Sequence, residues 1–301
     1  YWEIYFMEKY KGIETSYSIP AIRALGMLYP KNKRIYNDPF AEKILSGFNK
    51  YFVKLLHVPF VHKVITNFYE KKYSGFLGYF FCRFRYYDDV IKLCLQKNDI
   101  DVIVNMGAGM DCRPYYIEGL NKLHYYEIDH PKVIETKKKK LRNVLGELPD
   151  FVTYVEIDFD KQSIENVLQK AGYNPNLKTL FIWESVSAYL TKETNDTIFS
   201  FVSKANEGSK FVFSYATMDF MNGKNLSHKT LKLLYERIRV KKELILQHGF
   251  EQNEIEKYLR NFSISTIEHI GSKELKEKYI HPLDLKMDVA EVERFILAEV
   301  N

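Results

Sequence analysis

Two glycines follow the short apolar run 101–106, and an acidic residue stands twenty positions after the second glycine. The glycines are Gly107 and Gly109, and the acidic residue is Asp129, which ends a second apolar run. Glycines after a buried strand let a ligand approach the backbone, and a carboxylate at this spacing can accept hydrogen bonds from ribose hydroxyls. Together the three residues predict a binding site for a nucleotide-like molecule.

Three further carboxylates extend this set. Asp111 closely follows the glycines, Asp158 ends a third apolar run, and Glu184 ends a fourth. Because ligands bind outside the carboxyl ends of the strands in open parallel sheets, we expect these side chains at one edge of a sheet. Taken singly, Asp158 and Glu184 could equally be caps of the helices that follow them.

Three classes of ligand compete for such a site. A dinucleotide would need a third glycine where this chain has Cys112, and Asp111 would repel its pyrophosphate. A nucleoside triphosphate would need the motif GxxxxGK[ST], which is absent. S-adenosylmethionine carries ribose and adenine but no phosphate, and its sulfur is positively charged. Because carboxylates at several strand ends suit this cation, the residues favour S-adenosylmethionine as the cofactor.

The elements that must position these residues alternate after about residue 99. Apolar runs predict strands, and the segments between them predict helices. The expected strands are 101–106, 123–129, 151–158, 178–184, 209–216, 262–270 and 294–300, and the expected helices are 111–121, 131–145, 161–171 and 191–206. A helical insertion is expected at about 219–260. This order predicts an α/β fold with a doubly wound, mostly parallel seven-stranded sheet.

Residues 1–98 are expected to form an N-terminal helical cap that belongs to the same domain as the core, residues 99–301. The part of the cap at 46–87 is rich in Phe and Tyr. Its helices could close over the sheet edge and shape an acceptor pocket, which is the interpretation we favour. Alternatively, residues 46–80 could make a peripheral membrane contact and receive a lipid-like substrate.

The composition argues against several other classes of protein. The net charge of the 301 residues is only +5, and the run Lys137–Lys140 is interpreted as a solvated helix face, so we expect no nucleic-acid partner. The three cysteines, Cys82, Cys94 and Cys112, lack CxxC spacing. We therefore expect a reducing compartment, the cytoplasm, and no metal site.

Neither a membrane span nor a signal peptide is expected. No apolar run reaches the roughly 18 residues that cross a bilayer. The N-terminus lacks a basic region followed by an apolar stretch, and Met7 could be the natural start, with residues 1–6 as an upstream extension. The sequence does not indicate an oligomeric state.

Six separated motifs resemble, in order and register, those of the leucine carboxyl methyltransferase family. This family comprises S-adenosylmethionine-dependent class I methyltransferases acting on carboxyl groups or on small molecules. The motifs are AIRALGMLYPKNKRIYNDPFAEKIL, GYFFCRFRYYDDVI, VNMGAGMDCRPY, YYEIDHPKVIETK, VEIDFD and LFIWESVSAYLTKE. The resemblance implies a Rossmann-like fold and S-adenosyl-L-methionine as cofactor. One departure is Cys112, where the family usually has threonine.

The resemblance also implies roles for residues on the first three strands. Gly107 and Gly109 would pass under the methionine portion of the cofactor, in a loop that continues to Asp111. Asp129 would hold the ribose diol. Asp158 and its neighbour Phe159 would lie at the adenine.

Further roles follow for the fourth strand and for the cap. Glu184 would face the amino group of the cofactor. An arginine of the cap would hold the cofactor carboxylate, for which we prefer Arg85 and keep Arg83 open. A guanidinium suits a carboxylate because it offers two parallel donors. Tyr189 would line the acceptor site as the catalytic candidate.

The expected activity is methyl transfer to a carboxylate or hydroxyl oxygen of a small organic molecule. A carboxylate acceptor is already ionised at neutral pH, whereas a hydroxyl acceptor needs a base such as Tyr189, His57 or His62. Two alternatives remain. The chain could methylate the C-terminal carboxylate of a partner protein, or it could be a catalytically silent scaffold that binds the cofactor.

Overall fold

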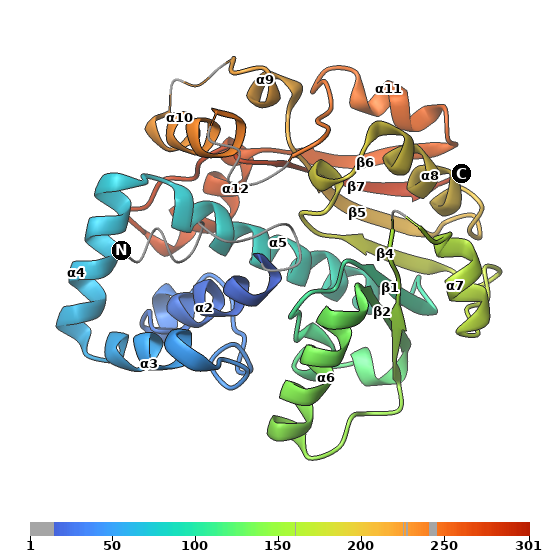
Figure 1. Ribbon diagram of the computed structural model, residues 1–301. Helices are drawn as coiled ribbons and strands as arrows, with labels where there is room; N and C mark the ends of the chain where they lie inside the picture. The colour runs from blue at the N-terminus through green and yellow to red at the C-terminus, as the bar shows by residue number, and fades with distance from the viewer. Residues whose placement is uncertain (1–14, 160, 225, 227, 241–245) are drawn as a thin grey trace.

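The computed structural model describes residues 15–159, 161–224, 226, 228–240 and 246–301, so the expectations about residues 1–6 and Met7 lie outside it. Its centre is a seven-stranded sheet in the order β3-β2-β1-β4-β5-β7-β6, in which β7 runs antiparallel to its neighbours β5 and β6 (Figure 1). The strands are β1 (Val102–Met106), β2 (His124–Asp129), β3 (Val152–Glu156), β4 (Thr179–Trp183), β5 (Lys210–Tyr215), β6 (Ile264–Ile270) and β7 (Arg294–Val300). The predicted α/β sheet is confirmed.

Helices precede, separate and follow the strands. The α-helices are α2 (Thr15–Met27), α3 (Gly47–Leu56), α4 (Pro59–Lys72), α5 (Phe76–Lys97), α6 (Pro131–Leu145), α7 (Ile164–Lys170), α8 (Lys192–Val202), α9 (Met218–Met221), α10 (Lys229–Tyr235), α11 (Ile255–Arg260) and α12 (Ser272–Leu275). Single turns named below are η2 (Arg113–Tyr115), η3 (Leu120–Lys122), η4 (Ser187–Tyr189) and η5 (Glu236–Val240). Helices α2 to α5 form the predicted N-terminal cap, and α9, α10, η5 and α11 lie between β5 and β6, where the insertion was expected.

Both faces of the central strands β1, β4 and β5 are buried, which explains why these strands are almost continuously apolar. On one face, Ile103 of β1 and Ile182 of β4 pack in the same core as the long helix α5. On the other face, Val104 and Trp183 pack with residues of α7, α8 and α11. The helix α5 thereby belongs to the core as well as to the cap.

The helix expected at 111–121 is absent, and this expectation was wrong. The segment forms only the turns η2 and η3. Three local features oppose a helix. The Asp111 side chain accepts the Arg113 backbone N–H at 3.0 Å, Pro114 has no N–H to donate, and Gly119 has a left-handed φ of 92°.

The lysine run on α6 is also less solvated than expected. Lys137 is buried and forms an ion pair of 2.8 Å with Glu127 of β2, while the Lys140 Nζ donates to the Ile44 carbonyl oxygen. Lys139 is exposed. Two of the four lysines therefore fasten α6 to its neighbours, and the run does not form a uniform basic face.

Candidate active site

A cavity of about 650 Å³ opens at the carboxyl ends of the parallel strands, where the sequence predicted a ligand site. A volume of this size is typical of small-molecule sites. Nine of the ten residues predicted for the site line it: Arg83, Gly107, Gly109, Asp111, Asp129, Asp158, Phe159, Glu184 and Tyr189. Arg85 is not among the lining residues.

The turn after β1 brings the backbone to the cavity. Gly107 has a φ of 80°, and a Cβ at this position would lie 2.5 Å from Val186 Cγ2. Gly109 has a φ of 50°, and its N–H donates to Asp129 Oδ2 at 2.6 Å. The positive φ of both residues, and the clash of a Cβ at position 107, therefore explain why glycine occupies these two positions. The Gly109 N–H also links the turn directly to the end of β2.

Asp129 is the carboxylate of the cavity that forms no ion pair with any described residue. Its Oδ1 accepts the His130 N–H at 2.6 Å, and its Oδ2 accepts the Gly109 N–H. Burial raises the pKa of Asp129, while these two backbone donors act in the opposite direction. Each oxygen keeps a free lone pair, so the group can still accept hydrogen bonds from a ligand.

Glu184, in contrast, is held between two arginines. Its Oε1 lies 3.0 Å from Arg83 Nε, and its Oε2 accepts Arg113 Nη1 at 2.7 Å. Burial works to raise the pKa of Glu184, but the guanidinium groups of Arg113 and Arg83 outweigh it and hold that pKa below its usual value. The glutamate is thus ionised at the cavity wall, and so are its partners.

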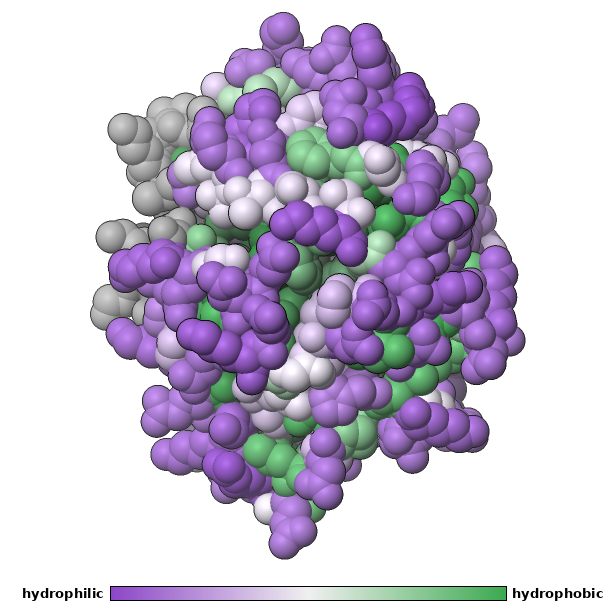
Figure 2. Space-filling view, turned by 90° about the vertical axis from the view of Figure 1, so that its right-hand side faces the viewer, coloured by the Kyte–Doolittle hydropathy of each residue, from purple (hydrophilic) through white to green (hydrophobic). Residues whose placement is uncertain are grey.

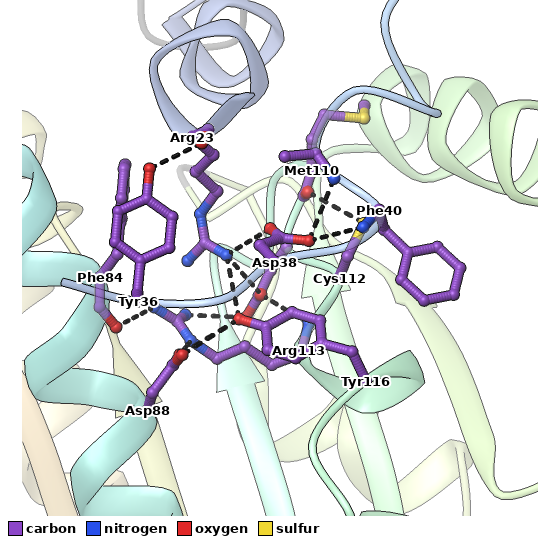
Figure 3. A network of polar contacts seen from close by, with 12 residues as sticks. Arg23, Tyr36, Asp38, Phe40, Phe84, Asp88, Met110, Cys112, Arg113 and Tyr116 are labelled. Atoms are coloured by element: carbon purple, nitrogen blue, oxygen red, sulfur yellow. Dashed lines mark hydrogen bonds and ion pairs between the residues drawn. The ribbon is translucent and has the colours of Figure 1, made fainter. Parts of the chain in front are cut away.

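Arg113 is the centre of a buried polar network that ties the sheet edge to the cap (Figure 3). Its Nη1 also donates to Asp111 Oδ2 at 3.0 Å, and its Nε donates to Asp88 Oδ1 on α5 at 2.7 Å. From α2, Arg23 donates to Asp38 Oδ2 at 2.9 Å and lies 4.0 Å from Asp111 Oδ1. Despite burial, Arg113 and Arg23 hold the pKa of Asp111 below its usual value.

The structure separates the two candidate arginines of α5. Arg83 is buried and lines the cavity. Arg85 is partly exposed, donates through Nε to Asp89 Oδ1 at 2.7 Å, and donates through Nη1 to the Ile35 carbonyl oxygen at 2.9 Å. The preference for Arg85 as a site residue therefore finds no support in its position, whereas Arg83 stands where a ligand could reach it.

The remaining predicted residues that line the cavity are Asp158, Phe159 and Tyr189. Asp158 and Phe159 follow β3, and the Asp158 carboxylate pairs with Lys161 at 2.8 Å. Tyr189 ends the turn η4, and its carbonyl oxygen accepts the side-chain amide of Gln247. His57 and His62 are not among the lining residues.

A second polar group in the cavity was not predicted. The Tyr79 hydroxyl donates to Glu293 Oε2, and Ser185 Oγ donates to Glu293 Oε1 at 2.7 Å. Arg83 Nη1 donates to both hydroxyls at 3.0 Å. Ser185 has a φ of 59°, so these hydrogen bonds hold a strained residue in place.

Topology could have pointed to Glu293. It directly precedes β7, and Arg294 pairs with Tyr215 at the end of β5. Because β7 is antiparallel, its first residues lie at the edge where the parallel strands end. Arg23 and Arg113 stand inside the family motifs, so those motifs were the available signal for them.

The other side of the cavity is apolar. Its wall comes from α5, the helical insertion and the segment just before β7, through Phe76, Phe80, Phe220, Leu234, Ile238, Leu246 and Val292. No residue of 46–72 lines the cavity. Of the cap segment 46–87, only the α5 residues Phe76, Tyr79, Phe80 and Arg83 contribute to it, so the expected pocket-forming role holds for α5 and not for α3 or α4.

Two features are absent from the part of the chain that the structure describes. None of its helices is both long and apolar enough to cross a bilayer. No group of three or more His, Cys, Asp or Glu side chains in this part is arranged to bind a metal ion.

Two known structures superpose on this chain along most of its length. A candidate methyltransferase from Thermobifida fusca superposes with a TM-score of 0.57 at 11% sequence identity, covering 92% of this chain and 97% of that one. A DUF574 family protein from Streptomyces avermitilis superposes with a TM-score of 0.55 at 11% identity, covering 80% of this chain and 90% of that one. These similarities establish the Rossmann-like fold.

Sequence comparison adds relatives with methyltransferase names. The chain is 28% identical over 178 residues to YktD of Bacillus subtilis, a candidate S-adenosyl-L-methionine-dependent methyltransferase, covering 58% of each chain. It is 25% identical over 228 residues to leucine carboxyl methyltransferase 1 of Rattus norvegicus, covering 65% of this chain and 69% of the rat protein. The match to YktD thus spans less than two thirds of that relative.

A family model decides the assignment. The model described as leucine carboxyl methyltransferase matches residues 18–203, which include most of α2, the whole of α5 and the first four strands with their cavity residues. This match contains all the site residues predicted from the sequence. The chain belongs to the leucine carboxyl methyltransferase family.

Proposed function

We propose that this protein is an S-adenosyl-L-methionine-dependent methyltransferase that transfers a methyl group to a carboxylate or hydroxyl oxygen of a small organic molecule. The observation that carries the proposal is the division of one cavity into two parts. Charged and glycine residues line it at the strand ends, and apolar side chains of α5 and the insertion line it elsewhere. The first part suits a charged cofactor, and the second suits the body of an acceptor.

The residues at the strand ends fit the proposed cofactor. Asp129 has lone pairs available for a ribose diol. At position 107 only glycine fits, because a Cβ there would clash with Val186. Glu184 would face the amino group, and Arg83 would hold the carboxylate. The name of the relative YktD, a candidate S-adenosyl-L-methionine-dependent methyltransferase, supports the same cofactor.

When bound, the cofactor would supply a methyl group on a positively charged sulfur. The protein would then contribute alignment of the acceptor and exclusion of water. The apolar wall formed by Phe76, Phe80 and Phe220 serves the second purpose. It also favours an acceptor with an apolar body.

The acceptor oxygen determines whether a base is needed. A carboxylate acceptor reacts in its ionised form and needs none. For a hydroxyl acceptor, Glu293 is the lining carboxylate that could take the proton, through the hydrogen bond it accepts from Tyr79 or Ser185. Burial keeps the pKa of Tyr79 well above its usual value, so this phenol acts as a donor and not as the base.

Two other functions remain as alternatives. A C-terminal carboxylate of a partner protein is an alternative acceptor, because one relative carries the name leucine carboxyl methyltransferase 1. A silent scaffold would bind the cofactor without turnover.

The three cysteines are buried and free, which fits a cytoplasmic location.

The first test is isothermal titration of the purified protein with S-adenosylhomocysteine. We expect binding, and we expect Asp129→Ala to weaken it about 10- to 100-fold, because hydrogen bonds to a charged group contribute roughly 1.5–3 kcal/mol. Asp150→Ala is the matched control, since Asp150 is exposed and does not line the cavity. Absent binding, or equal affinity in the two variants, would refute the proposed cofactor site.

The acceptor is found by incubating a cell extract with the protein and a donor carrying a radiolabelled methyl group. Label in the small-molecule fraction is the expected result. Label in a protein band would favour the protein carboxyl methyltransferase, and binding without any label would favour the scaffold. Release of the label as methanol by mild base would identify a carboxyl ester and exclude an ether.

A further inference from the structure

Helices α3 and α4 carry apolar side chains on their outer faces as well as on their inner ones. Val53 and Leu56 of α3 and Ile65 of α4 pack inward. Seven of the eleven large apolar residues that are exposed in the described chain lie on the outside of this helix pair. These are Phe48, Tyr51, Leu55, Val58, Phe60, Val64 and Phe68, here called the α3–α4 surface.

Neither the packing of α3 and α4 nor the lining of the cavity explains why these exposed residues are apolar. Tyr51 is 73% exposed and Phe60 is 75% exposed, although a surface helix ordinarily turns a single apolar stripe inward. No residue of α3 or α4 lines the cavity. In Figure 1 the two helices form the left-hand border of the molecule. The opposite side, seen in Figure 2, is mostly hydrophilic, with apolar residues in scattered groups.

The charged residues within α3, α4 and their connection are almost all positive. The segment 46–73 contains five lysines and one glutamate, so it carries +4 of the +5 net charge of the chain. Lys50, Lys54, Lys63 and Lys71 are exposed. The single glutamate, Glu70, is turned inward, where its carboxylate accepts the backbone N–H groups of Gly75 and Asp288. The exposed side therefore combines apolar side chains with exposed lysines.

We propose that the α3–α4 surface docks on a lipid bilayer that contains anionic headgroups. Aromatic and aliphatic side chains would enter the boundary of the acyl chains, and the lysines would reach the headgroups. A second copy of the chain fits less well, because a two-fold contact through this surface would bring two +4 segments together. The proposal does not depend on the acceptor or on the proposed activity.

The test is co-sedimentation of the full chain with vesicles, either of phosphatidylcholine alone or with a third of it replaced by phosphatidylserine. We expect binding to the anionic vesicles that weakens at high salt. Tyr51→Ser with Phe60→Ser, and separately Lys54→Glu with Lys63→Glu, should each weaken it by about tenfold or more. Circular dichroism and S-adenosylhomocysteine titration confirm that each variant is folded.

Matched controls lie elsewhere on the surface. Ile267→Ser removes an apolar side chain that is 53% exposed on β6, and Lys139→Glu with Lys170→Glu reverses two exposed lysines. Both controls should bind anionic vesicles like the unchanged protein. Absent binding, equal binding to both vesicle types, or equal loss in the controls would overturn the proposal. So would a dimer, detected by sedimentation velocity, that Tyr51→Ser with Phe60→Ser abolishes while vesicle binding persists.

Discussion

Arg83 and Arg85 show how much depends on the orientation of a single helix. They are two residues apart on α5, which turns about 100° per residue, so their side chains leave the helix on nearly opposite sides. Arg83 points to the cavity and contacts Glu184, Tyr79 and Ser185. Arg85 pairs with Asp89 on the same helix. The two arginines therefore have different surroundings: Arg83 lies at the cavity, and Arg85 lies in a partly exposed ion pair.

This difference gives a prediction at the residue scale. Arg83→Lys should weaken S-adenosylhomocysteine binding by about tenfold or more, because lysine cannot reproduce the paired donors of a guanidinium. Arg85→Lys should change the affinity by less than about twofold, since it alters only a partly exposed ion pair. Isothermal titration of both variants measures the effect, and urea midpoints separate it from a loss of stability. Equal affinities would remove Arg83 from the cofactor site.

At the scale of elements, a buried ion pair joins helix α6 to strand β2. Lys137 and Glu127 are both buried, and their charged atoms are 2.8 Å apart. Burial raises the pKa of Glu127 to about 7, although Lys137 acts to lower it. Such a pair is costly to break, because the remaining charge stays in a dry environment.

Lys137→Met should therefore destabilise the fold in a pH-dependent way. Glu127 would lose the cation that lowers its pKa. When the pKa of a carboxyl is higher in the folded than in the unfolded protein, the free energy of unfolding falls as the pH rises from the unfolded pKa to the folded pKa. We expect a loss of about 3–5 kcal/mol near pH 8 and a smaller loss near pH 5.5, where the carboxyl can be protonated. Urea unfolding at both pH values measures this.

Two matched variants test the explanation. Lys139→Met changes an exposed lysine of the same helix and should alter stability by less than about 0.5 kcal/mol. Adding Glu127→Leu to Lys137→Met should recover much of the loss, because the unpaired buried charge is gone. A loss that is the same at both pH values would mean that the missing side-chain volume, and not the carboxylate, is responsible.

At the scale of the molecule, the cap and the sheet share their interior. Residues of α5 pack in one core with β1, β2 and β4, and the ion pair of Arg113 with Asp88 crosses the boundary at residue 98. The pair of Arg83 with Glu184 crosses it again beside the cavity. Removing the cap would thus expose one face of the sheet and leave buried charges without partners.

We therefore expect residues 15–301 to unfold as one unit. In a Trp2→Phe variant, Trp183 of β4 is the single tryptophan and reports on the sheet, while far-UV circular dichroism reports mainly on the helices. The two urea transitions should coincide in midpoint and slope. A helical transition at clearly lower urea would show that the cap unfolds independently.

The sequence by itself determined the parts of this protein that depend on local pattern. Short apolar runs predicted the strands, most clearly the central ones, because a strand buried on both faces is continuously apolar. The carboxyl ends of parallel strands share an edge, so Gly107, Asp129 and Glu184 could be expected together at one cavity. The family motifs extended this expectation to the cap arginines.

Only the tertiary structure decided what depends on packing between distant segments. The orientation of α5 turns Arg83, and not Arg85, toward the cavity. The antiparallel β7 brings Glu293 to the same cavity as Glu184, although the two are more than a hundred residues apart in the sequence. The 3₁₀ turns after Asp111 replace a helix because side chains there bond to the backbone and to arginines. Local pattern carries no information on these contacts, since they exist only once the elements are packed.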